Sequence, residues 1–91
     1  MLARTFFLNE HPIIILFDSG ASHDFIRSTC AKKVMLSMVA TEAPYVISTP
    51  RGRVDADQIV HISPIELAGR VFSTDLIILK GQGLDVILGM S

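Results

Sequence analysis

Cysteine, charge of one sign and long apolar runs are all scarce in this chain, and each shortage excludes a class of function. The single cysteine, Cys30, excludes an intrachain disulfide and a cysteine-based metal cluster, and it fits a reducing compartment. We expect Cys30 to be a small buried apolar residue. The net charge is −1, and the lysines and arginines are scattered and form no basic stripe, so no direct nucleic-acid partner is expected. The apolar patch at Phe6-Phe7-Leu8 is too short for a signal sequence or a membrane span, which predicts a soluble, intracellular, cytoplasmic protein with no membrane partner.

Several motifs of metal, nucleophile and phosphate chemistry are also missing. His11, His23 and His61 match no zinc-ligand spacing, so neither a metal nor another cofactor is expected. Ser19 is not part of a Gly-x-Ser-x-Gly motif, which argues against a serine hydrolase. The turn Gly81-Gln82-Gly83 is not followed by Lys-Ser/Thr and is therefore not a phosphate-binding loop.

What remains is a small chain that can form a core. It has 91 residues, of which 49% are hydrophobic and 19% are charged, as expected for one globular domain. A domain of this length buries a smaller share of its surface than larger domains do. Pairing with a second copy would therefore stabilise it.

Short apolar runs between turn signals predict a mostly β fold with one helix. The predicted strands cover 4–8, 13–17, 45–49, 54–63, 65–67, 71–79 and 84–91. Turns are predicted at 9–12, 50–53 and 68–70, and the strand 45–49, bounded by two prolines, is expected near a sheet edge. An apolar period near 3.6 predicts a helix over about 24–34, with Ser22 or Asp24 as its N-cap and lysines in its last turn. Residues 35–41 have no clear signal and are assigned to a connection.

One acidic residue stands where a predicted buried strand ends. Five apolar residues, Ile13 to Phe17, lead directly into Asp18-Ser19-Gly20. A carboxylate at the end of a buried strand is half desolvated, which suits it to sharing or transferring a proton. Aspartate, serine and glycine also favour turns, so a simple turn after a strand is the alternative. Asp24, Asp55, Asp57 and Asp75 are expected to be turn, cap or surface residues. Asp85, at the start of a predicted strand, is expected to be solvated and is assigned no catalytic role.

Two segments together carry a family resemblance. Residues 17–23 read Phe-Asp-Ser-Gly-Ala-Ser-His and precede the predicted helix, and the chain closes with Asp-Val-Ile-Leu-Gly-Met at 85–90. From about residue 13 to the end, the sequence resembles the retropepsin-type aspartic protease domain of plant gypsy-type LTR retrotransposon polyproteins. The resemblance implies a small closed retropepsin-like β-barrel with one short helix after the Asp-Ser-Gly loop. It further implies that residues 1–91 form a single such domain, which stops before the C-terminal helix and dimer strand of a typical retropepsin.

The resemblance also implies an activity, that of an aspartic endopeptidase acting on a retroelement polyprotein. Such hydrolysis uses one carboxylate to activate water and a second, protonated one to polarise the scissile carbonyl. The chain contains a single Asp-Ser-Gly, so the second carboxylate would come from another copy in a homodimer. Asp18 would then be catalytic, one per subunit, with a polypeptide as substrate. The alternative is a truncated, catalytically silent module with a peptide-binding or dimerising role.

Further site residues follow from the resemblance alone. In the active-site loop, Ser19 would brace the two loops of a dimer, and Gly20, next to Ala21, would bring its backbone close to the carboxylates and the substrate. Ile87, Leu88 and Gly89 would form the supporting element packed beneath that loop. The tip of the 49–55 hairpin would be the flap that closes over substrate, with Pro50, Arg51, Gly52 and Arg53 at its centre. An ordinary exposed hairpin is the alternative for this last segment.

Overall fold

The computed structural model describes residues 2–21, 23–49, 52–61, 65–67, 70–72, 75–81 and 83–89. Strands and one short helix make up most of these residues, which confirms the mostly β prediction. In chain order the elements are β1 (Leu2–Leu8), β2 (His11–Asp18), β3 (Phe25–Arg27), α1 (Ser28–Lys33), β4 (Met38–Thr49), β5 (Gly52–His61), β6 (Ile65–Leu67), β7 (Arg70–Phe72), β8 (Asp75–Leu79) and β9 (Val86–Gly89).

The first two strands form a hairpin, in agreement with the strands predicted at 4–8 and 13–17 on either side of a turn. β1 and β2 pair antiparallel, with Phe6 opposite Ile13 and Leu8 opposite His11. Asn9 and Glu10 form the two-residue turn, and both have positive φ, 48° and 67°. Turns of this kind match the right-handed twist of the strands they join, and asparagine tolerates the left-handed region better than most residues. The side-chain amide of Asn9 also donates to the carbonyl of Val34 at 2.8 Å, which ties the turn to the end of α1.

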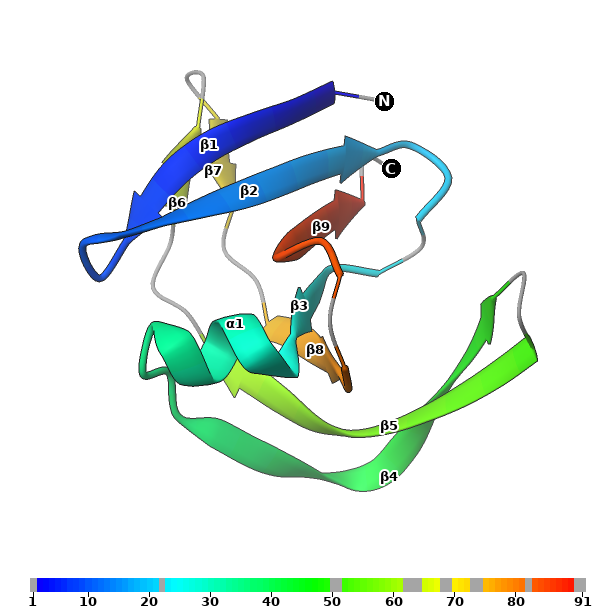
Figure 1. The fold of residues 1–91 in the computed structure, drawn as a ribbon. Coiled ribbons are helices and arrows are strands. Elements are labelled where there is room, and N and C mark those ends of the chain that lie inside the picture. The colour runs from blue at the N-terminus through cyan, green and yellow to red at the C-terminus, as the bar shows by residue number, and fades with distance from the viewer. Residues whose placement is uncertain are drawn as a thin grey trace.

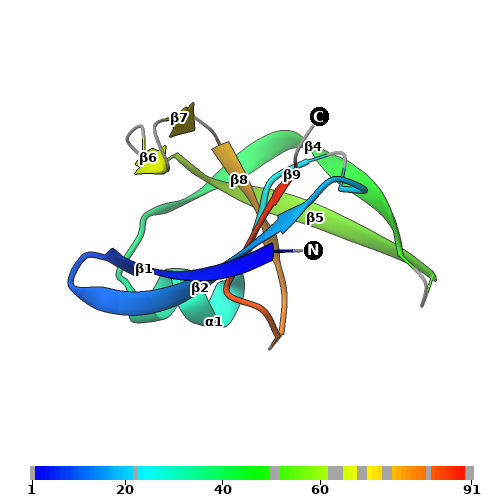
Figure 2. The same cartoon turned by 90° about the horizontal axis from the view of Figure 1, so that it is seen from above.

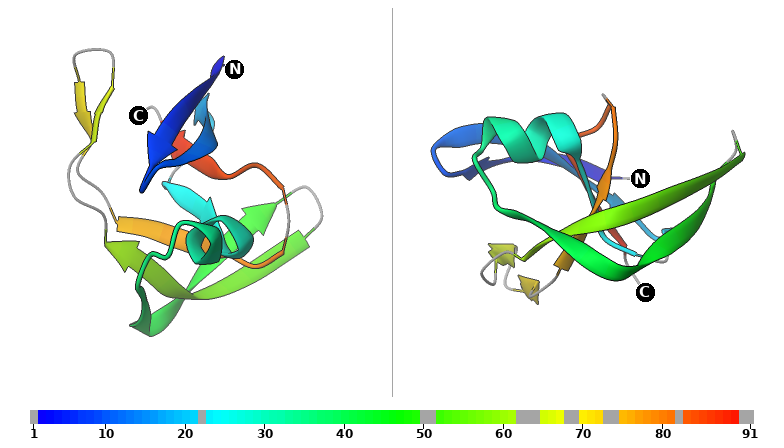
Figure 3. Two further views of the ribbon diagram at one scale, coloured as in Figure 1. Left: turned by 60° about the vertical axis from the view of Figure 1, so that its left-hand side comes forward. Right: turned by 90° about the horizontal axis from the view of Figure 1, so that it is seen from below.

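The curled main sheet contains strands from both the N-terminal and the C-terminal parts of the chain. Its strand order is β1-β2-β9-β3-β8-β5-β4, which brings β9, near the C-terminus, between β2 and β3 (Figure 1). The short hairpin of β6 and β7 forms a separate arm, seen clearly in Figures 2 and 3. Within the described residues β1 and β4 each pair with one strand only, so the sheet is open where the resemblance implied a closed barrel.

The helix prediction was wrong over its first four residues, 24–27. Residues 25–27 form β3, and α1 covers only Ser28–Lys33, with Arg27 as an N-cap that makes no side-chain capping bond. Phe25 and Ile26 are buried because β3 is hydrogen-bonded on both sides, to β8 and to β9. Tertiary pairing thus overrides the local helical period. Asp24 precedes β3 and is not the cap, while Ser22 lies outside the described residues. The predicted lysines, Lys32 and Lys33, do occupy the last turn.

Two boundaries in the second half also differ from the prediction. β4 begins at Met38, inside the segment assigned to a connection, and runs to Thr49 at the sheet edge where the prediction placed it. Its partner β5 runs over Gly52–His61. The predicted strand 71–79 is divided between β7, which pairs with β6, and β8, which joins the main sheet. The predicted turn at 68–70 falls largely outside the described residues.

The core has two parts on opposite faces of the sheet. The larger cluster gathers side chains from β2, β3, β5, β8, β9 and α1 around Ile15, Ile26 and Val60. Cys30 is buried in it, as predicted, and burial raises the pKa of its thiol to about 11. The smaller cluster consists of Phe25, Ala56 and Ile77, with partly buried side chains packed against them: Ala21, Ile47, Ile59, Leu79 and Ile87. In the described part of the chain, no helix is long and apolar enough to cross a membrane.

Candidate active site

Asp18 is the last residue of β2 and lies where that strand leaves the core. Its side chain is half-buried. The backbone N–H of Gly20 donates to Asp18 Oδ1 at 2.9 Å, and the N–H of Ala21 donates to the Asp18 carbonyl at 3.2 Å. The local Asp-Ser-Gly-Ala turn therefore fixes the carboxylate with a backbone amide on one oxygen. The second carboxylate oxygen is not held by this amide.

Gly89 stands directly beside Asp18, as its partner in the parallel pairing of β2 with β9. A Cβ at position 89 would lie 2.6 Å from the carbonyl oxygen of Ala21, too close for any side chain. The loop that carries Asp18 thus rests on the end of β9, and only glycine permits that approach. At Gly20 a Cβ would lie 3.3 Å from Asp18 Oδ1, a milder contact with a side-chain atom.

Asp24, at the far end of the loop that follows Asp18, also binds β9. Its Oδ1 accepts a hydrogen bond of 2.7 Å from the backbone N–H of Gly89, in a partly buried position. The loop between β2 and β3 is therefore pinned to β9 by a close backbone approach at Ala21 and by a charge-assisted hydrogen bond at Asp24. The sequence assigned Asp24 to a cap or the surface. No local signal marks its partner, which is 65 residues away.

Asp85 has a structural role of the same kind. Its carboxylate accepts a hydrogen bond of 2.8 Å from the N–H of Ile14, and its carbonyl accepts one of 2.9 Å from the N–H of Arg27. It therefore anchors the start of β9 between β2 and β3, away from the Asp18 loop at the other end of the strand. Asp75 pairs with His61 on the surface, with both side chains well exposed, which agrees with its surface assignment.

The predicted supporting element divides its side chains between the two clusters. Leu88 is buried in the larger cluster, and Ile87 packs against the smaller one together with Ala21 of the active-site loop. The alternation follows from the strand period of two. The smaller cluster therefore reaches from the Asp18 loop to the β4–β5 hairpin, through Ala21 and Ile87 at one end and Ile47 and Ala56 at the other.

The profile of the family described as retroviral aspartyl protease matches residues 1–91, the whole chain. The chain belongs to this family. A solved structure, the retroviral protease-like domain of Ddi1 from Leishmania major, is similar with a TM-score of 0.66 and 20% sequence identity, over 98% of this chain and 71% of that one. At this identity the likeness concerns the fold, and it confirms the retropepsin-like architecture. No curated protein matches the chain.

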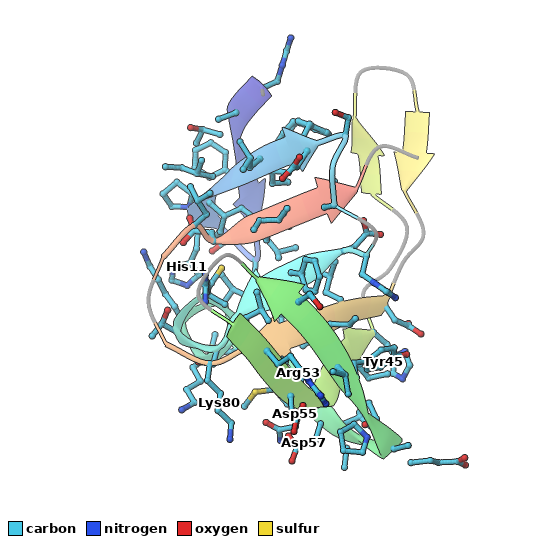
Figure 4. The ribbon with its side chains drawn as sticks, turned by 90° about the vertical axis from the view of Figure 1, so that its right-hand side faces the viewer. His11, Tyr45, Arg53, Asp55, Asp57 and Lys80 are labelled. Carbon is cyan, nitrogen blue, oxygen red and sulfur yellow. The ribbon has the colours of Figure 1, made fainter. Side chains whose placement is uncertain are left out.

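The β4–β5 hairpin contains the segment for which the sequence resemblance implied a flap. Gly52 and Arg53 open β5, directly after the hairpin tip, while Pro50 and Arg51 lie outside the described residues. Gly52 has φ 116° with open space around it, a conformation that glycine adopts without strain. Figure 1 shows the tip end of β4 and β5 extending well past β8, the strand with which β5 pairs. Arg53 and the acids Asp55 and Asp57 alternate along β5 and are exposed (Figure 4).

Among the described residues, no second acid is hydrogen-bonded to the Asp18 carboxylate. This carboxylate accepts its hydrogen bond from the backbone N–H of Gly20, in its own loop. No group of three or more histidine, cysteine, aspartate or glutamate side chains capable of holding a metal occurs among the described residues. The geometry thus presents one oriented carboxylate at the end of β2, in a loop that packs on the smaller apolar cluster through Ala21.

Proposed function

We propose that two copies of this chain combine their Asp18 side chains into one active site that hydrolyses peptide bonds. One carboxylate takes a proton from a water molecule, and the resulting hydroxide adds to the scissile carbonyl carbon. The partner carboxyl donates its proton to the carbonyl oxygen. Collapse of the tetrahedral intermediate breaks the C–N bond, and a proton passes to the leaving amine. Two carboxyls this close share one proton, so a pair supplies the base and the acid together.

The observation that carries this proposal is the Asp18 loop. Its turn holds the carboxylate by a backbone amide, and Gly89 and Asp24 fix the loop on β9. Membership of an aspartyl protease family supports hydrolysis as the reaction. A single such loop per chain supports a homodimer, since the family mechanism needs two carboxylates.

Membership of a protease family supports a polypeptide as substrate. The partly buried apolar side chains Ala21, Ile47 and Ile87 pack around the smaller cluster near the Asp18 loop, and an extended peptide would contact such side chains with every second residue. We infer that the natural substrate is a polyprotein of a retroelement, of the plant gypsy type, because the motif at residues 17–23 resembles those domains. The competing function is a silent module that binds peptides or dimerises without cleaving.

A cleavage assay with Asp18→Asn tests the proposal. The substitution keeps size and removes the negative charge, so it should abolish cleavage of a peptide library while the free energy of unfolding changes little. Glu10→Gln is the matched control, because Glu10 is an exposed turn residue at the far end of β2, and this variant should cleave as the parent does. Cleavage that persists in Asp18→Asn would contradict the mechanism. A folded parent that dimerises without cleaving would favour the silent module.

A further inference from the structure

The β4–β5 hairpin consists of two arms joined at an irregular point. Near the sheet, Met38–Ala40 pair with Gln58–Val60, and near the tip, Tyr45–Thr49 pair with Gly52–Ala56. Between the arms, the four residues 41–44 of β4 stand opposite the single residue Asp57 of β5, because Ala40 pairs with Gln58 and Tyr45 with Ala56. Extra residues on one strand interrupt the ladder and bend it. We call residues 41–44 the hinge.

The two arms are held very differently. The inner arm is fixed in the sheet, because β5 pairs with β8 through Ile59, Val60 and His61. Among the described residues, the outer arm has no strand partner beyond its own hairpin; it packs through Ala56 and Ile47 on the smaller cluster. A segment with few anchoring contacts opens at lower free energy than the sheet it extends from. The outer arm can therefore move about the hinge while the inner arm stays in place.

His23 contacts the outer arm where it starts. The His23 ring lies edge-on to Tyr45, with centroids 5.9 Å apart and planes at 70°, and it also neighbours Phe25 at 6.2 Å. Tyr45 is the first paired residue after the hinge, and it faces the same side as its partner Ala56, which is buried toward the smaller cluster. Figure 4 shows Tyr45 apart from the row of Arg53, Asp55 and Asp57 on β5. His23 itself belongs to the loop that carries Asp18.

We propose that His23 is a positioning residue that couples the hinge to the active-site loop. Through Tyr45 it sets the angle at which the outer arm leaves the hinge, and through its own loop it relates that angle to Asp18. Closure of the hairpin over a peptide would then be aligned with the catalytic carboxylate. This inference rests on the proposed function for its catalytic consequence, whereas the coupling itself is a property of the free chain.

Amide hydrogen exchange of the free chain tests the coupling without any activity. A perpendicular aromatic pair contributes about 0.5–1.5 kcal/mol, so His23→Ala should speed exchange of the outer-arm amides about 2- to 10-fold, with the inner arm unchanged. His23→Phe keeps a ring and should restore protection. Tyr45→Ala should act like His23→Ala, and combining the two should add little. His11→Ala, which alters a histidine of the β1–β2 hairpin, is the control and should leave the outer arm unchanged (Figure 4).

Outcomes for the coupling and for catalysis are separable. Exchange of the outer arm that stays unchanged in His23→Ala, or that rises equally across the whole chain, overturns the coupling. If the parent cleaves peptides, His23→Ala should raise KM several-fold with a smaller change in kcat, and His23→Phe should recover it. An unchanged KM would overturn the positioning role. A parent that does not cleave would refute the proposed function and with it the catalytic role of His23, and hydrogen exchange would still decide the coupling.

Discussion

At the scale of single residues, the site depends on backbone contacts more than on side-chain networks. The Asp18 carboxylate takes its hydrogen bond from the N–H of Gly20, and the loop is pinned by Gly89, whose N–H donates to Asp24. Glycine at 89 is required because the carbonyl of Ala21 occupies the space of a Cβ. The position of the Asp18 carboxylate therefore depends on Gly89, a residue of the neighbouring strand that has no side chain.

Gly89→Ala should destabilise the fold at this junction. The new methyl group would lie 2.6 Å from a backbone oxygen, so either the loop or β9 must shift. We expect a loss of about 1–3 kcal/mol in the free energy of unfolding, measured by urea denaturation. Gly20→Ala is the control with a smaller loss, since its contact at 3.3 Å is with a side-chain oxygen that can move. Equal stabilities of Gly89→Ala and the parent would contradict the close approach.

At the scale of elements, prediction from the sequence succeeded where neighbours along the chain decide the structure. The β1–β2 hairpin follows from two apolar runs around a turn, and Asp18 stands at the strand end because the apolar run stops there. β3 was missed because Phe25 and Ile26 fit a helical period locally, while strands β8 and β9, more than 45 residues away along the sequence, impose the strand. The bond from Gly89 to Asp24 and the hinge at 41–44 likewise depend on distant partners. A single sequence contains no signal for them.

The short helix α1 offers a pH-dependent test of element packing. Burial raises the pKa of Cys30 from 9.0 to about 11, with a smaller contribution from Asp85, while Lys33 acts in the opposite direction. As pH rises, the Cys30 thiol therefore loses its proton at a lower pH in the unfolded chain than in the folded chain. The stability due to the protonated thiol is fully present below about pH 9 and is lost as pH rises through about 11.

Between these pH values, we expect the free energy of unfolding to fall by an amount on the order of 1–3 kcal/mol because of Cys30. Cys30→Ala removes the titrating group at the cost of a small cavity, so the parent should be more stable at pH 7 and should lose this advantage toward pH 11. Urea unfolding of both proteins across that range makes the comparison, since other groups titrate equally in both. A stability difference that is constant with pH would show that the Cys30 thiol is not buried in the core.

At the scale of the whole molecule, one chain presents a single Asp18 loop, which under the proposed function is half of a two-carboxylate site. The main sheet brings Asp18, the apolar cluster around Phe25 and the β4–β5 hairpin to one region, which a second copy would complete. Membership of the retroviral aspartyl protease family supports peptide hydrolysis as the reaction of such a site. Activity should then depend on association, because a separate chain has no partner for its carboxylate.

The dependence of cleavage on chain concentration tests this directly. Light scattering and the rate of peptide cleavage per chain are measured on the same dilution series. We expect the mass to rise toward twice the 10.0 kDa of one chain, and the rate per chain to rise with the same midpoint. A rate per chain that does not change with dilution, in samples whose mass stays at that of one chain, would contradict a site shared between two copies of Asp18.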